Sequence, residues 1–154
     1  MFVITGLCIS LIAVIFAGDL WIKNYIERTV IEGQTRKLWG GRLLIHKHHN
    51  RGAMLNAGQS RQKAVAALSV IMTLVAAAVF IFSLGQKGNN MLRIGLALLL
   101  GGAFSNTYDR LKRKYVVDYF SFGVKWKRLR NIIFNLSDFC IIIGARTSAI
   151  GAGR

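Results

Sequence analysis

Four long apolar stretches limit the folds open to this sequence more than any other feature. They cover approximately residues 2–25, 64–84, 91–108 and 132–150. Each is close to the roughly 20 residues that a helix needs to cross a hydrocarbon core about 30 Å thick. Backbone groups inside lipid must be hydrogen-bonded internally, and the stretches lack the two-residue alternation of barrel strands. We therefore expect an all-α membrane protein built as a bundle of four transmembrane helices.

The composition agrees with this expectation. The chain is 53% hydrophobic and contains no proline, which is too apolar for an ordinary soluble domain. Its 154 residues are typical of one domain, so we expect residues 1–154 to form a single integral membrane domain. The first apolar stretch has no basic residue before it and no convincing small-residue cleavage site. We interpret it as a retained transmembrane helix and not as a cleaved signal peptide.

Positive charge is concentrated in two connecting segments. The formal net charge is +15, with eight Lys or Arg residues between the first two apolar stretches and eight more in residues 110–130. Basic segments can bind nucleic acid, but in a membrane protein the anionic lipid headgroups are the nearer partner. We expect contacts with membrane phospholipids and none with nucleic acid. The positive-inside rule would place both segments in the cytoplasm.

Chain direction decides which helix ends meet in a four-helix bundle. The C-terminal ends of the first and third helices share one face with the N-terminal ends of the second and fourth. All six carboxylates of the chain fall on that face, and ionisable groups at membrane depth usually mark function. The sequence therefore predicts a polar site there. Its candidate residues are Asp19, Lys23, Asn50, Asn106, Asp109, Asp118, Asn135 and Asp138.

Two local spacings repeat within this set. Asn106 precedes Asp109 by three positions, and Asn135 precedes Asp138 by three, so each amide lies on the same helical face as its carboxylate. The amide can orient the acid or bond an adjacent backbone group. Helix capping or interhelical bonding is the alternative reading of either pair alone.

Asp19 and Lys23 stand four residues apart, and the simplest interpretation is a salt bridge near the lipid. Gly52 predicts a turn or a close backbone approach just after Asn50. The segments "RLLIHKHH" and "VVDYFSFGVKW" are rich in β-branched and aromatic residues, which favour strands. We expect them to form a small sheet on the membrane surface.

No metal site is predicted. His46, His48 and His49 are close in sequence, but no carboxylate stands at ligand spacing, so we expect solvated loop histidines. Cys8 and Cys140 lie inside apolar stretches without a neighbouring base, as small buried hydrophobic residues do.

A pair of aspartates can perform hydrolysis. Two close carboxyl groups do not both ionise cheaply, so one keeps its proton while the other acts as a base on a water. Asp118, after the third helix, and Asp138, just inside the fourth, are the expected pair. Asp109 remains an alternative to Asp118 as the second acid.

Five motifs occur in order along nearly the whole chain: "DLWIK", "NRGAM", "GGAFSNTYDR", "VVDYF" and "FNLSD". In these motifs the sequence resembles the bacterial lipoprotein signal peptidases, also called signal peptidase II. The resemblance implies an intramembrane aspartic endopeptidase. Its partners would be lipidated prolipoproteins, cut just before the lipobox cysteine after that cysteine has received a diacylglyceryl group.

The resemblance also implies residue roles. Asp118 and Asp138 correspond to the catalytic dyad. The residues that correspond to its supporting polar groups are Asp19, Asn50, Asn106, Asp109, Arg110 and Asn135, and we add Lys23 and Gly52 from their positions. One departure is Ser137, where the family usually has Ala, which predicts an extra hydrogen bond beside Asp138.

Further expectations follow from the same resemblance. They are no metal and no organic cofactor, a monomer, and a multi-pass protein of the bacterial cytoplasmic (inner) membrane. The catalytic face and its β-rich cradle would be extracytoplasmic, which conflicts with the count of basic residues. We give the resemblance more weight, because lipoproteins are processed after export.

Two other functions are compatible with buried aspartates. A small transporter or proton relay would carry ions on them, but it should place acids at several depths of the bundle, and here they are confined to one end. A noncatalytic scaffold could use Asn and Asp between helices, but it gives no reason for Asp118 outside a helix.

Overall fold

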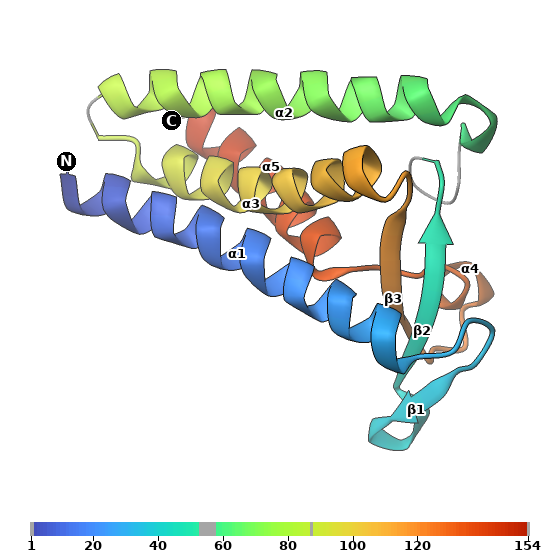
Figure 1. Ribbon diagram of the computed structural model, residues 1–154. Coiled ribbons are helices and arrows are strands. Elements are labelled where there is room, and N and C mark those ends of the chain that lie inside the picture. The colour runs from blue at the N-terminus through green and yellow to red at the C-terminus, as the bar shows by residue number, and fades with distance from the viewer. Residues whose placement is uncertain (1, 53–57, 87, 154) are drawn as a thin grey trace.

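The structure is a computed structural model that describes residues 2–52, 58–86 and 88–153 (Figure 1). It is mostly helical, and each of the four predicted apolar stretches contains a long helix. Both α1 and α2 are long and apolar enough to cross a membrane. The helices are α1 (Phe2–Thr29), α2 (Gln62–Gly85), α3 (Asn90–Lys112), the short α4 (Lys127–Arg130) and α5 (Leu136–Ala152).

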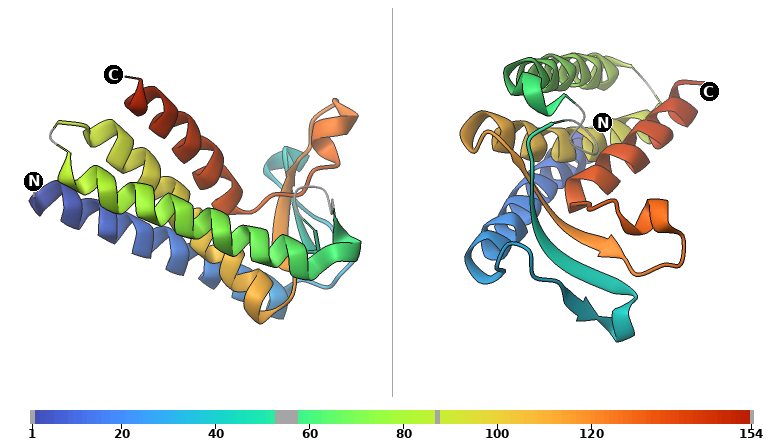
Figure 2. Two further views of the ribbon diagram at one scale, coloured as in Figure 1. Left: turned by 90° about the horizontal axis from the view of Figure 1, so that it is seen from above. Right: turned by 90° about the vertical axis from the view of Figure 1, so that its right-hand side faces the viewer.

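The central element of the bundle is α3, which packs against α1, α2 and α5 (Figure 2). Its contact with α5 is close because glycines line it. A Cβ atom on Gly95 would lie 2.5 Å from the backbone N of Ser148, and one on Gly102 would lie 2.5 Å from the backbone O of Ser137. Small residues let helix backbones approach in this way. The approach at Gly102 brings the start of α5 against the polar end of α3.

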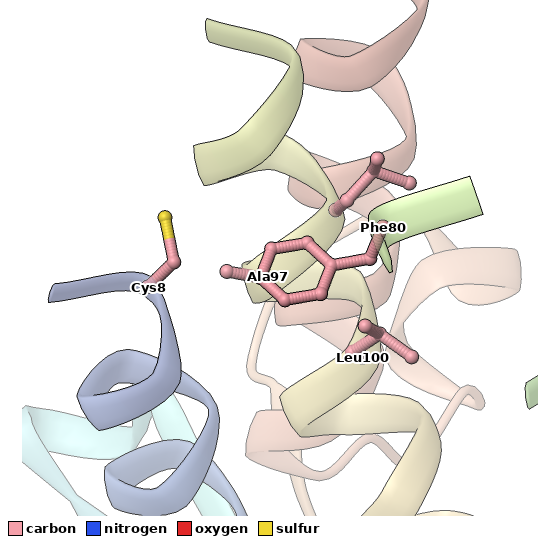
Figure 3. Close-up of a cluster of buried hydrophobic side chains, with 5 residues drawn as sticks. Cys8, Phe80, Ala97 and Leu100 are labelled. Carbon is pink, nitrogen blue, oxygen red and sulfur yellow. The ribbon is translucent and has the colours of Figure 1, made fainter. Parts of the chain in front are cut away.

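An apolar cluster fills the bundle at the end opposite the sheet. Phe80 of α2 and Leu100 of α3 pack in it with Ala97 and Cys8 (Figure 3). Cys8 is buried in this cluster, and Cys140 is half-buried on α5. Both are free thiols, in keeping with their interpretation as small apolar residues.

A three-stranded antiparallel sheet lies across the ends of the helices (Figure 1). Its order is β1 (Arg36–Leu38), β2 (Leu43–Asn50) and β3 (Val116–Phe122). The short 3-10 turn η1 (Trp39–Gly41) joins β1 to β2, and η3 (Gln59–Arg61) precedes α2. Both predicted strand segments are therefore confirmed as β2 and β3. The exposed strand β1 was not predicted.

The expectation of solvated loop histidines is wrong. His46, His48 and His49 are half-buried on β2, because the sheet packs against the end of α1. His46 Nε2 lies 2.7 Å from Ser121 Oγ, and His49 Nε2 lies 2.7 Å from a carboxylate oxygen of Glu27 on α1. Within the described residues, no group of three His, Cys, Asp or Glu side chains is arranged to hold a metal ion.

The predicted start of the fourth helix at residue 132 is also wrong. Residues 132–134 are not helical, and Phe134 pairs with Phe120 of β3 through backbone hydrogen bonds of 2.7 and 3.0 Å. The helix begins only after Asn135, whose side chain caps it. Asp138 is therefore the third residue of α5 and not the seventh residue of a helix that begins at 132.

Candidate catalytic site

The predicted polar residues meet where the sheet covers the ends of the helices. They come from α1, α3, α5, β2 and β3, which are distant in sequence but adjacent in the fold (Figure 1). Half of the eight candidates are fully buried, which is costly for charged and polar groups unless they are paired. These are Asp19, Lys23, Asp109 and Asn135, and the neighbouring Ser105 and Ser137 are fully buried too.

Lys23 is the centre of the deepest part of the site. Its Nζ lies 2.8 Å from Asp19 Oδ2 and 3.2 Å from Asp109 Oδ2, and it donates to Ser105 Oγ at 3.0 Å and Asn106 Oδ1 at 2.8 Å. The predicted Asp19–Lys23 ion pair is confirmed. It is fully enclosed by protein and does not face the lipid, because α3 and the sheet cover it.

Asp19 joins four elements through its carboxylate. It accepts hydrogen bonds from Ser105 Oγ at 2.6 Å, Ser137 Oγ at 2.5 Å and Tyr119 Oη at 2.9 Å. Tyr119 Oη in turn accepts from the backbone N–H of Leu136. The extra hydrogen bond expected from Ser137 is present, but it goes to Asp19 and not to Asp138. The function of Asp19 in the structure is to hold α5 and β3 against α1.

Asp109 is a buried connection between α3 and the sheet. Its Oδ2 accepts from the backbone N–H of Val117 at 3.2 Å, and its Oδ1 lies 3.2 Å from Arg113 Nε. Asp109 is not among the described residues that line the cavity holding Asp118. This geometry favours a bracing role and weakens the alternative in which Asp109 replaces Asp118 as an acid.

Asp118 and Asp138 line one cavity of about 190 Å³. Asn135 connects them. Its Nδ2 donates to Asp118 Oδ1 at 2.7 Å, its backbone N–H donates to Asp138 Oδ2 at 3.0 Å, and its Oδ1 accepts from the backbone N–H of Asp138 at 2.9 Å. One capping residue therefore fixes both the start of α5 and the relative position of the two carboxyl groups.

A second amide orients each carboxyl group. Asn50 Nδ2 donates to Asp118 Oδ2 at 3.0 Å, and Asn106 Nδ2 donates to Asp138 Oδ1 at 3.0 Å. The backbone N–H of Gly52 bonds Asn50 Oδ1, so the predicted turn after Asn50 holds that amide in place. Asn106 was expected to orient Asp109 on its own helix. It bonds Asp138 instead, because α5 lies closer to its amide group.

Asp118 is 4% exposed on β3. Its burial, and then the nearby Asp138 carboxylate, raise the pKa of Asp118 to about 7. The hydrogen bonds from Asn50 and Asn135 oppose this shift, because they stabilise the ionised form. Asp118 thus holds a proton below about pH 7, as a general acid must.

The cavity wall also has an apolar part, which sequence reasoning missed. The segment that precedes α5 supplies Ile132, Ile133 and Phe134, and α5 itself supplies Ile141 and Ile142. Arg110 completes the wall and donates to the backbone oxygens of Asn106 and Gly52, at 3.4 and 3.3 Å. Nothing separates these isoleucines in sequence from ordinary lipid-facing residues, so only the fold identifies them.

A wide groove opens beside this cavity. It has a volume of about 610 Å³ and runs between α2, α3 and α5. Most of its lining is apolar, including Leu68, Met72 and Val79 of α2, and it reaches Asn106 and Asp138. The carboxyl group of Asp138 is therefore accessible from the side of the bundle.

Comparison with known proteins finds similarity to one family. The family model described as signal peptidase (SPase) II matches residues 11–152. The lipoprotein signal peptidase of Shouchella clausii is 34% identical over 85% of this chain and 82% of its own length. That of Clostridium acetobutylicum is 31% identical over 84% of this chain and 71% of its own length.

Two solved structures described as bacterial membrane enzymes share the fold. One has a TM-score of 0.80 at 22% identity and covers 96% of this chain and 87% of its own. The other has a TM-score of 0.79 at 23% identity, with 96% and 92% covered. With the family match along almost the whole sequence, these findings show that the chain belongs to the signal peptidase II family.

Proposed function

We propose that this protein is an aspartic endopeptidase of the bacterial membrane that removes signal peptides from prolipoproteins, with Asp118 and Asp138 as its catalytic dyad. The observation that carries the proposal is the shared cavity, in which Asn135 holds both carboxyl groups. Membership of the family supports the peptidase activity. A transporter or proton relay is not favoured.

The dyad holds one proton between its two members. Asp138 takes a proton from a water, whose oxygen attacks the carbon of the scissile amide. Asp118 gives its proton to the carbonyl oxygen as the tetrahedral intermediate forms. The intermediate then collapses, with the proton on Asp138 passing to the leaving nitrogen and a hydroxyl proton returning to Asp118. The starting state is restored and one water is consumed.

The surrounding residues keep this geometry fixed. Asn50 donates a hydrogen bond to Asp118 Oδ2, and Asn106 donates one to Asp138 Oδ1. Lys23 donates to Asn106 Oδ1 and so orients this amide. Arg110 positions the backbone near Gly52 at the cavity mouth. The apolar groove between α2 and α5 suits a hydrophobic signal peptide, whose end would reach Asp138.

The expected activity is a single cut before the lipidated cysteine. Purified protein incubated with a diacylglyceryl prolipoprotein should release the signal peptide, and the product masses should locate the cut at that cysteine. A precursor whose lipobox cysteine is replaced by Ser, and which therefore carries no lipid, is the matched control and should stay intact. Cutting elsewhere, or equal cutting of both precursors, would contradict the proposed substrate.

The same assay predicts a pH dependence. Above about pH 7 Asp118 loses its proton, so kcat/KM should fall on the alkaline side, approaching tenfold per pH unit. Asn50→Ala removes a hydrogen bond that lowers the pKa of Asp118, so it should move this limb to higher pH while reducing the maximal rate. If the alkaline fall in kcat/KM occurs at the same pH in Asn50→Ala, the titration of Asp118 does not cause it.

We further propose that all four long helices span the membrane as one domain and that the protein is monomeric. At about 1.5 Å per residue, the 23 residues of α3 reach roughly 35 Å and the 17 of α5 roughly 26 Å. The catalytic face is extracytoplasmic, against the count of basic residues, because precursors are processed after export. A reporter fused at Gln86 should then be cytoplasmic, and an extracytoplasmic reporter would refute this orientation.

A further inference from the structure

A strongly basic pocket lies beside the catalytic cavity. It has a volume of about 330 Å³ and is formed by the start of α2, the end of α3 and the segment after β2. Four of its eight lining residues are cations, namely Arg51, Lys63, Arg110 and Lys114. No carboxylate is among the described residues that line it. This local excess of positive charge favours an anionic ligand, because the cations repel one another. Arg110 also interacts electrostatically with Asp118, Asp138 and Asp109 of the neighbouring site.

Arg110 borders both this pocket and the catalytic cavity, and one of its donors has no partner among the described residues. Its two terminal nitrogens make long hydrogen bonds to backbone oxygens, at 3.3 and 3.4 Å. Its Nε is buried and has no hydrogen-bond partner within the described part of the chain. Buried donors are seldom left unpaired in folded proteins, so an additional acceptor is expected near this guanidinium.

An apolar groove continues from the basic pocket along α3. It has a volume of about 510 Å³, lies between α1 and α3, and shares Leu111 with the pocket. Its lining is almost entirely apolar and includes Phe16, Phe104 and Tyr108. From Leu111 to Phe104 the groove follows seven residues of α3, or about 10 Å towards the middle of the bundle.

The arrangement of the basic pocket and the apolar groove suits a phospholipid. The start of α2 and the end of α3, which line the basic pocket, lie at the sheet end of the helices (Figure 1). In a membrane-spanning bundle this end lies among the lipid headgroups, and the groove extends from it towards the middle of the bundle. A phosphodiester carries the negative charge that the cations require, and an acyl chain fits a narrow apolar groove. The larger groove beside α5 also borders Arg110, but it leads to Asp138 and is open to substrate.

We propose that the basic pocket and the α1–α3 groove together bind one anionic phospholipid. The phosphate lies against Lys63, Lys114 and Arg51, and one acyl chain lies along Phe104 and the neighbouring groove residues. This site is separate from the dyad, and lipid binding does not depend on peptide cleavage. Its wall includes Arg110, which the catalytic cavity shares.

Native mass spectrometry of the detergent-purified full chain tests the proposal. Dioleoylphosphatidylglycerol should bind in a one-to-one complex at least about tenfold more tightly than dioleoylphosphatidylcholine, since each basic residue near an anionic surface contributes about 1 kcal/mol. Inorganic phosphate and dioleoylglycerol, added separately, should each fail to displace it at equal concentration. Equal binding of the two phospholipids would overturn the proposal. Displacement of dioleoylphosphatidylglycerol by inorganic phosphate alone or by dioleoylglycerol alone would also overturn it.

Two sets of variants locate the site. Lys63→Gln with Lys114→Gln should weaken phosphatidylglycerol binding about tenfold or more. Lys37→Gln with Lys125→Gln changes the net charge equally at exposed positions outside the pocket and should leave binding unchanged. Ala13→Phe, which fills the groove from α1, should also weaken it. Equal losses in both lysine pairs would show nonspecific attraction, and unchanged binding in Ala13→Phe would exclude the groove.

Discussion

Replacing either Asp118 or Asp138 with Asn should lower kcat for prolipoprotein cleavage by about 10³-fold, within the range that general acid–base catalysis contributes. Asn keeps the size of the side chain but neither takes up nor releases a proton at neutral pH. Without Asp138, no base activates the water. Without Asp118, no acid protonates the carbonyl oxygen. The rate of product formation with a diacylglyceryl precursor in detergent measures both effects.

Glu32→Gln is the matched control for these variants. It makes the same carboxylate-to-amide change on the same end of the protein, but Glu32 is exposed and lies outside the cavity. Its rate should stay within about twofold of the unmodified protein, as for most surface substitutions. Thermal unfolding of each purified variant shows whether it is folded. A folded variant at Asp118 or Asp138 with near-normal kcat would remove that residue from the mechanism.

The second large effect is expected at Lys23. Lys23→Met keeps the length of the side chain but leaves Asp19 and Asp109 buried without their shared cation. Removing one partner of a buried ion pair typically costs about 3–5 kcal/mol. We expect a loss of that size in the free energy of unfolding, measured by denaturant titration in mixed micelles. Cleavage should slow as well, since Lys23 orients the amide of Asn106 towards Asp138.

Lys47→Met is the matched control for Lys23→Met. Lys47 also pairs with a carboxylate, Glu27, but at 3.5 Å and with both side chains partly exposed. Solvent screens such a pair, so its loss should cost about 1 kcal/mol or less. Similar losses in the two variants would mean that Lys23 is not the essential counter-charge of the buried aspartates.

The helices and the two longer strands were predictable because their signals are local. Long apolar stretches indicated the long helices, and β-branched and aromatic residues indicated β2 and β3. The convergence of the polar residues on one end of the bundle could be predicted from the direction of each helix. β1 was missed because its three residues, Arg36–Leu38, are too few and too polar to give a strand signal.

The partners inside the site were not predictable from spacing. Asn106 has Asp109 on its own helical face, yet it bonds Asp138 across the α3–α5 interface, where glycines bring the two helices together. The connection of Asp118 to Asp138 through Asn135 likewise depends on where α5 begins. Sequence periodicity carries no information on such contacts between elements, which are set by packing.

The most direct test of the dyad is kcat of Asp118→Asn, of Asp138→Asn and of the protein with both changes. Residues that act as one catalytic unit are strongly non-additive, because either loss alone abolishes the shared step. The doubly changed protein should therefore cleave the lipidated precursor about as slowly as the slower single variant. Losses that multiply, with the double variant slower by the product of the two single effects, would show that the two carboxyl groups act independently.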